Sequence, residues 1–258
     1  MGQVIAITSG KGGVGKSSVC VNLGIVLAQM DYKVCLIDCD LGLKNLDVML
    51  GLENRVLYDL RDAMEGRCSL SKAVLRDKRE PNLYLLPACK SVNLKYFQGT
   101  DLQLVVQELR KSFDFILLDT PAGIESGFIH SIACADQVVL VSTLDITAIQ
   151  DADRVIGILM KEGIEDIGLV INKMNPRYID KGISIRLEDA ISWLSIQLLG
   201  YVFDDESVIR SNNRGMPICL SKSAQINECY EIITRRLLGE QVSLPKYKEK
   251  KFLQKLFG

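Results

Sequence analysis

Residues Gln3–Ser18, with the sequence QVIAITSGKGGVGKSS, decide the fold of this chain. Val4–Ile7 is an apolar, mostly β-branched run that is typical of a buried parallel strand. A glycine-rich loop follows, and a helical pattern begins at Lys16 and is predicted to run to about Met30. A strand, a G-x-x-x-x-G-K-[ST] loop at Gly10–Ser17 and a helix, in this order, predict a P-loop for a nucleotide phosphate.

The residue types of this loop fit phosphate chemistry. Glycines allow consecutive backbone N–H groups to converge on phosphate oxygens, and the helix that follows directs its positive end at the same anion. Lys16 can reach the β- and γ-phosphates, and the Ser17 hydroxyl can bind Mg²⁺. A structural glycine turn is the alternative, but the strand before the loop and the helix after it favour the phosphate site.

Lys11 is a second lysine in the loop, five positions before Lys16. An ordinary P-loop needs one lysine, and a second cation close to the first would be repelled by it. Lys11 is either a solvated loop lysine or a lysine that reaches a phosphate held by a second subunit. The sequence KGGVGKS at Lys11–Ser17 resembles the signature-lysine (deviant Walker A) ATPases. The resemblance implies that two subunits enclose two ATP molecules and that Lys11 acts on the partner's nucleotide.

The composition is ordinary for a soluble globular protein. The chain has 258 residues, of which 48% are hydrophobic and 24% charged, enough for one large domain with a substantial core. Its formal net charge is −1, so no overall basic field is present and no specific nucleic acid partner is expected. The eight cysteines include no C-x-x-C pair, as is usual for thiols in a reducing cytoplasm. No apolar run reaches ~18 residues, so no segment is predicted to cross a membrane.

Strand and helix patterns alternate along the rest of the chain. Further strands are predicted at Lys33–Ile37, Asn82–Leu86, Phe113–Asp119, Gln137–Ser142, Gly168–Asn172 and Leu198–Phe203. Further helices are predicted at Leu102–Lys111, Ile146–Met160, Ile185–Leu194, Asp204–Ser211 and Ser223–Leu238. This alternation predicts an α/β single-domain P-loop NTPase with a mostly parallel sheet and helices on both faces. We expect the ATPase domain to span residues 1–239, followed by an extended, mobile linker at 240–249 and an amphipathic helix at 250–258.

Three aspartates follow the predicted strands and complete the expected site. Asp38 and Asp40 come directly after a buried strand, at the edge where α/β sheets bind ligands. Asp119 ends an apolar strand in the Walker B pattern, and it is placed to hold Mg²⁺ through water because Mg²⁺ in such sites keeps several waters. The predicted metal ligands are Ser17, Asp119 through water and, as a further candidate, Asp38.

Thr120 occupies the position where many motor ATPases have a glutamate that activates water. We therefore expect slow hydrolysis and assign the orientation of the attacking water to Asp40. The predicted catalytic residues are Lys11, Lys16 and Asp40.

Asn172-Lys173-Met174-Asn175 resembles the base-reading N-K-x-D motif of GTPases, with Asn175 in place of the aspartate. An aspartate would accept two N–H groups from guanine and an amide does so poorly, whereas Asn172 can pair with the N6 and N7 edge of adenine. The motif favours ATP, and an asparagine that caps a strand end is the alternative. The predicted nucleotide-binding residues are Lys11, Gly12, Gly13, Val14, Gly15, Lys16, Ser17, Ser18 and Asn172.

The last ten residues or so have a different pattern. At about 100° per residue their four large apolar side chains share one arc, and lysines lie opposite. Docking back onto the domain is one interpretation, but it would not need so many lysines. A helix on an anionic membrane surface uses both faces. The predicted membrane-binding residues are Lys251, Phe252, Leu253, Lys255, Leu256 and Phe257.

Four stretches together resemble the MinD family: SGKGGVGKSS at 9–18, DCDLGLKNLD at 38–47, LLDTPAGIESG at 117–127 and KKFLQKLFG at 250–258. The resemblance covers essentially the whole chain. It implies an ATP-dependent homodimer that uses ATP and Mg²⁺ on the cytoplasmic face of the cell membrane and positions the bacterial division septum. It also implies a MinC-like division inhibitor and a MinE-like activator as partners, which dock near Thr147–Arg154. The chain departs from the family pattern at Cys39, at Ser17-Ser18 and at Phe203, where a proline near the adenine is usual.

Three rival functions belong to the same superfamily. A DNA-partition ATPase should show a basic patch, which the near-neutral chain does not predict. A flagellar-number ATPase usually carries extra residues before the first strand, which here begins at residue 3. An iron–sulfur scaffold or reductase needs paired cluster cysteines, and these spacings offer no such pair. The septum-positioning ATPase is therefore favoured.

Overall fold

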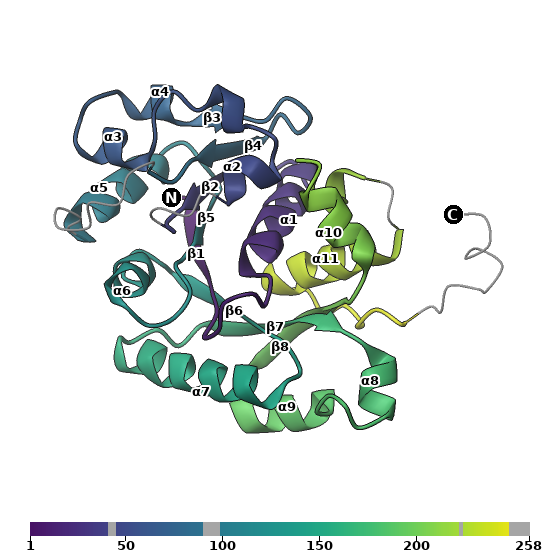
Figure 1. Ribbon diagram of the computed structural model, residues 1–258. Coiled ribbons are helices and arrows are strands. Elements are labelled where there is room, and N and C mark those ends of the chain that lie inside the picture. The colour runs from purple at the N-terminus through teal and green to yellow at the C-terminus, as the bar shows by residue number, and fades with distance from the viewer. Residues whose placement is uncertain (41–44, 90–98, 222–223, 248–258) are drawn as a thin grey trace.

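An eight-stranded sheet runs through the computed structural model, which describes residues 1–40, 45–89, 99–221 and 224–247 (Figure 1). The strands lie in the order β3-β4-β2-β5-β1-β6-β7-β8, and all neighbouring pairs are parallel except β3 and β4. They are β1 (Gln3–Thr8), β2 (Val34–Asp38), β3 (Leu75–Arg76), β4 (Leu83–Leu86), β5 (Phe115–Asp119), β6 (Gln137–Ser142), β7 (Ile167–Met174) and β8 (Gln197–Phe203). The prediction of a mostly parallel sheet is confirmed.

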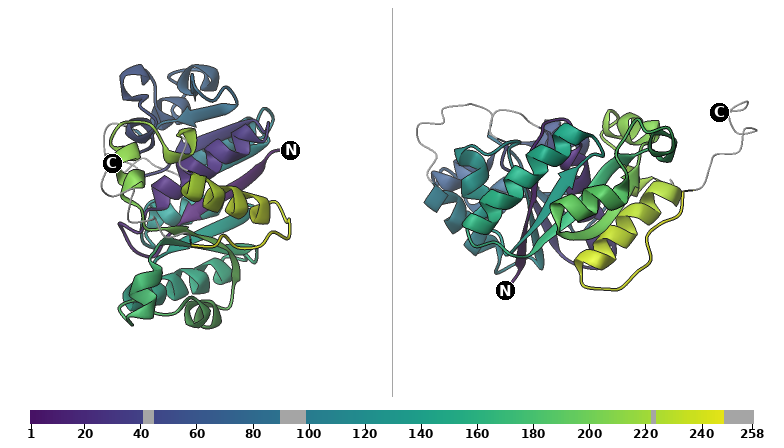
Figure 2. Two further views of the ribbon diagram at one scale, coloured as in Figure 1. Left: turned by 90° about the vertical axis from the view of Figure 1, so that its right-hand side faces the viewer. Right: turned by 90° about the horizontal axis from the view of Figure 1, so that it is seen from below.

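Helices cover both faces of this sheet (Figures 1 and 2). One face carries α1 (Lys16–Gln29) and α11 (Ala224–Leu237), which pack on each other. The other carries α6 (Ser126–Ile132), α7 (Ile146–Lys161) and α9 (Leu187–Leu194), with α5 (Gly99–Leu109) beside α6. Shorter helices lie in the connections: α2 (Leu46–Met49), α3 (Leu60–Met64), α4 (Leu70–Ala73), α8 (Pro176–Asp180) and α10 (Glu206–Asn212). Weak amphipathic patterns at Leu57–Met64 and Leu70–Leu75 match α3 and α4, whereas the sequence did not predict α6, α8 or the antiparallel β3.

The central strands are buried because their residues are apolar on both faces. Val4–Ile7 of β1 are 0% exposed, and β1 lies between β5 and β6. Gly24 allows α1 to approach the sheet closely, since a Cβ there would lie 2.5 Å from a methyl group of Leu36. Parallel pairing brings the carboxyl ends of β1, β2, β5 and β7 to one edge, and this edge positions the site.

The segment after α11 runs back along the edge strand β8 (yellow in Figure 2). The Arg236 guanidinium donates to the carbonyls of Val242 and Leu198, at 2.8 and 2.9 Å. The Tyr201 hydroxyl donates to the Pro245 carbonyl at 2.5 Å. Residues 240–247 form no helix or strand, and these contacts attach them to β8, whereas a mobile segment was expected.

Some predicted features lie wholly or partly outside the described residues. The amphipathic helix at 250–258 lies wholly outside them, as do residues 248–249 of the predicted linker and Ser223 of the last predicted helix. Among the described helices, none combines the length and the apolar character that a membrane crossing requires.

Candidate functional site

The P-loop joins β1 to α1 at the carboxyl edge of the sheet. Gly15, the N-cap of α1, has φ 94°, a backbone conformation that favours glycine. A Cβ built at Gly12 or Gly13 would meet nothing within 4 Å, so this side of the loop is open. The first turn of α1 contains no acidic residue, and its positive end is available for an anion. The loop therefore has the shape and polarity of a phosphate cradle.

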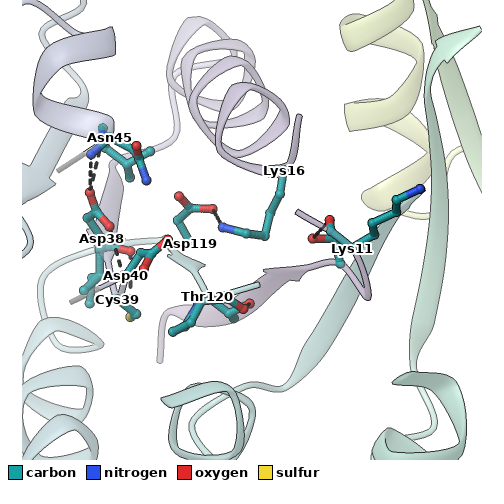
Figure 3. A network of polar contacts seen from close by, with 12 residues as sticks. Lys11, Lys16, Asp38, Cys39, Asp40, Asn45, Asp119 and Thr120 are labelled. Atoms are coloured by element: carbon teal, nitrogen blue, oxygen red, sulfur yellow. Dashed lines mark hydrogen bonds and ion pairs between the residues drawn. The ribbon is translucent and has the colours of Figure 1, made fainter. Parts of the chain in front are cut away.

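Lys16 and Asp119 form the buried centre of the site (Figure 3). The Lys16 ammonium lies 2.6 Å from Asp119 Oδ1, and the two side chains are 7% and 0% exposed. Burial alone would lower the pKa of Lys16, but the charge and hydrogen bond of Asp119 outweigh it, so that pKa is raised. Asp119 Oδ2 is buried and accepts no hydrogen bond from the described residues. Such an oxygen is costly unless a ligand or ion satisfies it.

Asp38, at the end of β2, organises the backbone beside this pair. Its Oδ2 accepts the N–H groups of Asn45 and Leu46, both at 3.2 Å, and Oδ1 accepts that of Asp40 at 3.1 Å. Burial, followed by the negative charge of Asp119, raises the pKa of Asp38 to about 7. One carboxylate oxygen of Asp38 thus holds the start of α2, and the other holds the backbone at Asp40. The predicted metal contact of Asp38 stays a prediction.

Asp40 is partly exposed and feels the charges of Lys16 and Asp119. Its pKa is raised, first by burial and also by Asp119, while Lys16 acts in the opposite direction. A carboxylate with a raised pKa beside the phosphate cradle suits the acceptance of a proton from water. The neighbouring Cys39 is 2% exposed, and burial raises the pKa of its thiol, so it is not a reactive thiolate.

Lys11 points away from Lys16 (Figure 3), and its ammonium reaches the start of α7. Its ammonium donates to Thr147 Oγ1 at 2.6 Å and to Asp145 Oδ1 at 3.2 Å. Lys11 and Asp145 are 44% and 51% exposed. Asp145 also caps α7 by accepting the N–H of Ala148 at 3.0 Å. Partial burial acts to raise the pKa of Asp145. Hydrogen bonds from Thr143, Thr147, Ala148 and Lys11 outweigh burial and hold this pKa well below its usual range.

The end of β7 contacts the outer side of the P-loop. Asn172 Nδ2 donates to the Val14 carbonyl at 2.8 Å, and the Lys173 ammonium donates to the Gly13 carbonyl at 2.7 Å. A cavity of about 360 Å³ lies beside Lys11–Val14 and is also lined by Lys173, Asn175 and Asp204. The Asn175 side chain caps α8. The structure thus adds a contact with the loop to the base contact predicted for Asn172, which remains a prediction.

Comparisons with known proteins agree with this geometry. Residues 5–218 match the CobQ/CobB/MinD/ParA nucleotide binding domain. The chain is 43% identical over 251 residues to the septum site-determining protein MinD of Bacillus subtilis, with 96% of this chain and 94% of that protein covered. The chain belongs to the MinD family. It is therefore a P-loop ATPase of cell division that determines the septum site.

Two solved MinD structures have the same fold. One is described as the MinC:MinD cell division protein complex of Aquifex aeolicus, with a TM-score of 0.89, 38% identity and coverage of 95% of this chain and 100% of that chain. The other is MinD complexed with Mg-ADP from Pyrococcus horikoshii, with a TM-score of 0.82, 27% identity and coverage of 92% and 96%.

The site of this MinD-family chain fits ATP and Mg²⁺. The open cradle accommodates phosphates, and Ser17 offers its hydroxyl in the first turn of α1. The free Asp119 Oδ2 suits the water shell of Mg²⁺, which would neutralise charge on the phosphates. Ser18 is 8% exposed and accepts a hydrogen bond from Asn212 Nδ2 at 3.2 Å, so its hydroxyl also serves the packing of α10.

Sequence reasoning missed Asp145 and the P-loop contacts of Thr147 and Lys173. Asp145 and Thr147 had a local signal, because an aspartate directly before a helical pattern is a common N-cap. Lys173 stands in the N-K-x-D-like stretch, but nothing in the pattern of β7 shows that its side chain meets a loop 160 residues away. Phe203, noted as a departure near the adenine, is 3% exposed and packs against Tyr247 of the linker, with ring centroids 5.1 Å apart.

Proposed function

We propose that this MinD-family ATPase is a membrane switch that dimerises on ATP. In each subunit Lys16 and Ser17 hold the phosphates and Mg²⁺, Asp119 binds the ion through water, and Asp40 orients the attacking water. Lys11 acts on the nucleotide of the partner subunit. The observation that carries this proposal is the direction of Lys11, which lies beside the cradle yet extends away from its own phosphate site.

The dimer presents two membrane-binding tails at once. Burying one Phe or Leu contributes roughly 1.5–3 kcal/mol, and each lysine near anionic lipid contributes about 1 kcal/mol. Ordering each tail residue costs on the order of 1–2 kcal/mol for the backbone alone. One tail therefore binds only marginally, like a single myristoyl chain. A second tail on the same dimer inserts intramolecularly and strengthens binding by ~10²–10⁴.

The linker is attached to the domain at a defined point, from which each tail would extend. Tyr247 packs against Phe203, the last residue of β8, so the chain leaves the domain near the edge of the sheet that carries the P-loop. We assign residues 1–239 to the ATPase domain, 240–249 to the linker and 250–258 to an amphipathic helix on the cytoplasmic face of the membrane. Dimerisation at the sheet edge that carries the P-loop then brings the attachment points of the two linkers together.

We assign a MinC-like inhibitor and a MinE-like activator to the surface at Thr147–Arg154, at the start of α7. The support is the named MinC:MinD complex of a relative and the position of Thr147, which accepts a hydrogen bond from Lys11. A partner on this surface would touch the residue that holds the signature lysine. Binding there is therefore suited to influence dimerisation and hydrolysis.

Vesicle pelleting tests the switch. With ATP and Mg²⁺, the protein should pellet with vesicles that contain phosphatidylglycerol, and with ADP it should stay in the supernatant. Replacing Phe252 and Leu256 by Glu should abolish pelleting and leave ATP-dependent dimerisation intact, and Leu57→Glu, at an exposed residue of the domain, is the control. Pelleting by the double variant, or pelleting that is equal with ADP, would contradict the proposal. Retardation of DNA by the ATP-bound protein would favour the partition ATPase instead.

A further inference from the structure

Strand β7 is irregular at the point where it meets the P-loop. Its pairing with β8 shifts register between Ile171 and Met174. Within this irregularity Lys173 has φ 55°, in the left-handed region that residues other than glycine seldom adopt. Such strain persists only where the surroundings determine it strongly, and it often marks a functional position.

The irregularity brings two neighbouring side chains to the same target. In a regular strand, successive side chains point to opposite faces of the sheet. Here Asn172 donates to the Val14 carbonyl at 2.8 Å, and Lys173 donates to the Gly13 carbonyl at 2.7 Å. Gly15 accommodates the approach, since a Cβ there would lie 2.2 Å from Asn172 Nδ2. Two successive carbonyls of the P-loop are thus held from one strand end.

Holding these carbonyls also directs the N–H groups of the loop. A trans peptide is planar, so its N–H points opposite to its C=O. When the carbonyls of Gly13 and Val14 are turned toward β7, the N–H groups of Val14 and Gly15 are turned away from β7. The positive charge of Lys173 on the carbonyl side strengthens the polarity of the same peptide.

We propose that Lys173, with Asn172, is a positioning residue for ATP: it braces the P-loop so that backbone N–H groups stay directed at the phosphates. The brace acts on the phosphate part of the ligand and not on the base. A direct contact of Lys173 with the base or ribose is the competing role, because Lys173 also lines the cavity beside the loop. The two roles differ in which part of ATP should feel the loss of Lys173.

Lys173→Met keeps most of the aliphatic stem and removes the donor. Its dissociation constants for Mg-ATP and for Mg-tripolyphosphate, measured by calorimetry, should both rise roughly tenfold, as for the loss of one charge-assisted hydrogen bond. Lys173→Arg, which can still donate to the carbonyl, should recover most of the affinity. Lys161→Met, at an exposed lysine on α7, is the matched control and should change neither constant.

Lys173→Gly separates the brace from a merely structural role. Glycine adopts φ 55° without strain, so this variant should unfold at a higher temperature than Lys173→Met while binding tripolyphosphate equally weakly. If a Lys173 variant bound ATP more weakly but bound tripolyphosphate normally, the proposed support of the P-loop would be wrong and Lys173 would contact the base or ribose. Unchanged affinity for both ligands in Lys173→Met would also overturn it.

Discussion

The P-loop carries two lysines with opposite surroundings. Lys16 pairs with Asp119, and both side chains are nearly or wholly buried. Lys11 pairs with Asp145, and about half of each side chain is exposed. A buried charge cannot leave its partner unless another anion takes that place, whereas an exposed pair contributes about 0–1 kcal/mol and can be exchanged for water. Burial therefore commits Lys16 to its own nucleotide site and leaves Lys11 free to change partners.

Removing the buried lysine should have the largest effect. Lys16→Ala should abolish tight ATP binding, because it deletes the cation that faces the phosphates. It should also destabilise the nucleotide-free protein by about 3–5 kcal/mol, because Asp119 is left charged and buried. Calorimetry and urea unfolding measure the two effects. Adding Asp119→Asn should restore stability without restoring binding. A Lys16→Ala protein that is as stable as the wild type would contradict the conclusion that Lys16 and Asp119 form a buried pair.

Removing the exposed lysine should leave binding intact and abolish assembly. Lys11→Ala should bind ATP with nearly normal affinity but lose ATP-dependent dimerisation and hydrolysis, because the cation that crosses to the partner's nucleotide is missing. Light scattering with ATP measures the assembly, and Lys161→Ala is the control for the loss of an exposed lysine. A Lys11→Ala protein that still dimerises would refute the role across the interface.

Replacing Asp40 tests whether this carboxylate orients the attacking water during ATP hydrolysis in the site that contains Lys16. Asp40→Ala should retain ATP binding while single-turnover hydrolysis falls ~100-fold, as is usual for the loss of a general base. Asp189→Ala, at an exposed aspartate of α9, is the matched control. Unchanged turnover would show that Asp40 is a loop carboxylate without a role in the reaction.

The buried part of the site should also make the stability of the protein depend on pH. Asp38 has an ordinary pKa of 3.8 and a folded pKa of about 7, so between these values only the folded state keeps the proton. Unfolding then releases a proton, and the free energy of unfolding falls as the pH rises from about 4 to about 7. Urea unfolding in EDTA without nucleotide measures this, and Asp38→Asn should flatten the slope. A slope that persists in Asp38→Asn would assign it to another group.

Loosening the exposed pair should have the smallest effect. Asp145→Asn keeps the cap on α7 and removes the charge that faces Lys11, so ATP-dependent dimerisation should become up to ~5-fold more favourable. Raising the salt concentration should shift the wild type in the same direction more than the variant, because salt screens this exposed pair. Weaker dimerisation of Asp145→Asn would indicate that Asp145 itself contributes to the dimer.

The sequence by itself determined the architecture and the centre of the site. Apolar runs identify the parallel strands, and the glycines and Lys16 identify the P-loop, because these signals are local. Asp119 was found in the same way, since an acid at the end of a buried strand can only lie at the carboxyl edge of the sheet. The unusual Lys11 was also visible, although its partners were not.

Tertiary structure decided which distant groups these residues meet. The pairing of Lys11 with Asp145 spans 134 residues, and the bond from Lys173 to Gly13 spans 160. Periodicity reports which face of an element is buried but not which side chain reaches which loop. The linker illustrates the same limit, because its polar, proline-containing sequence predicted a free segment, and only the fold placed Pro245 beside Tyr201. Contacts of this kind depend on how strands are ordered in the sheet, which no local stretch encodes.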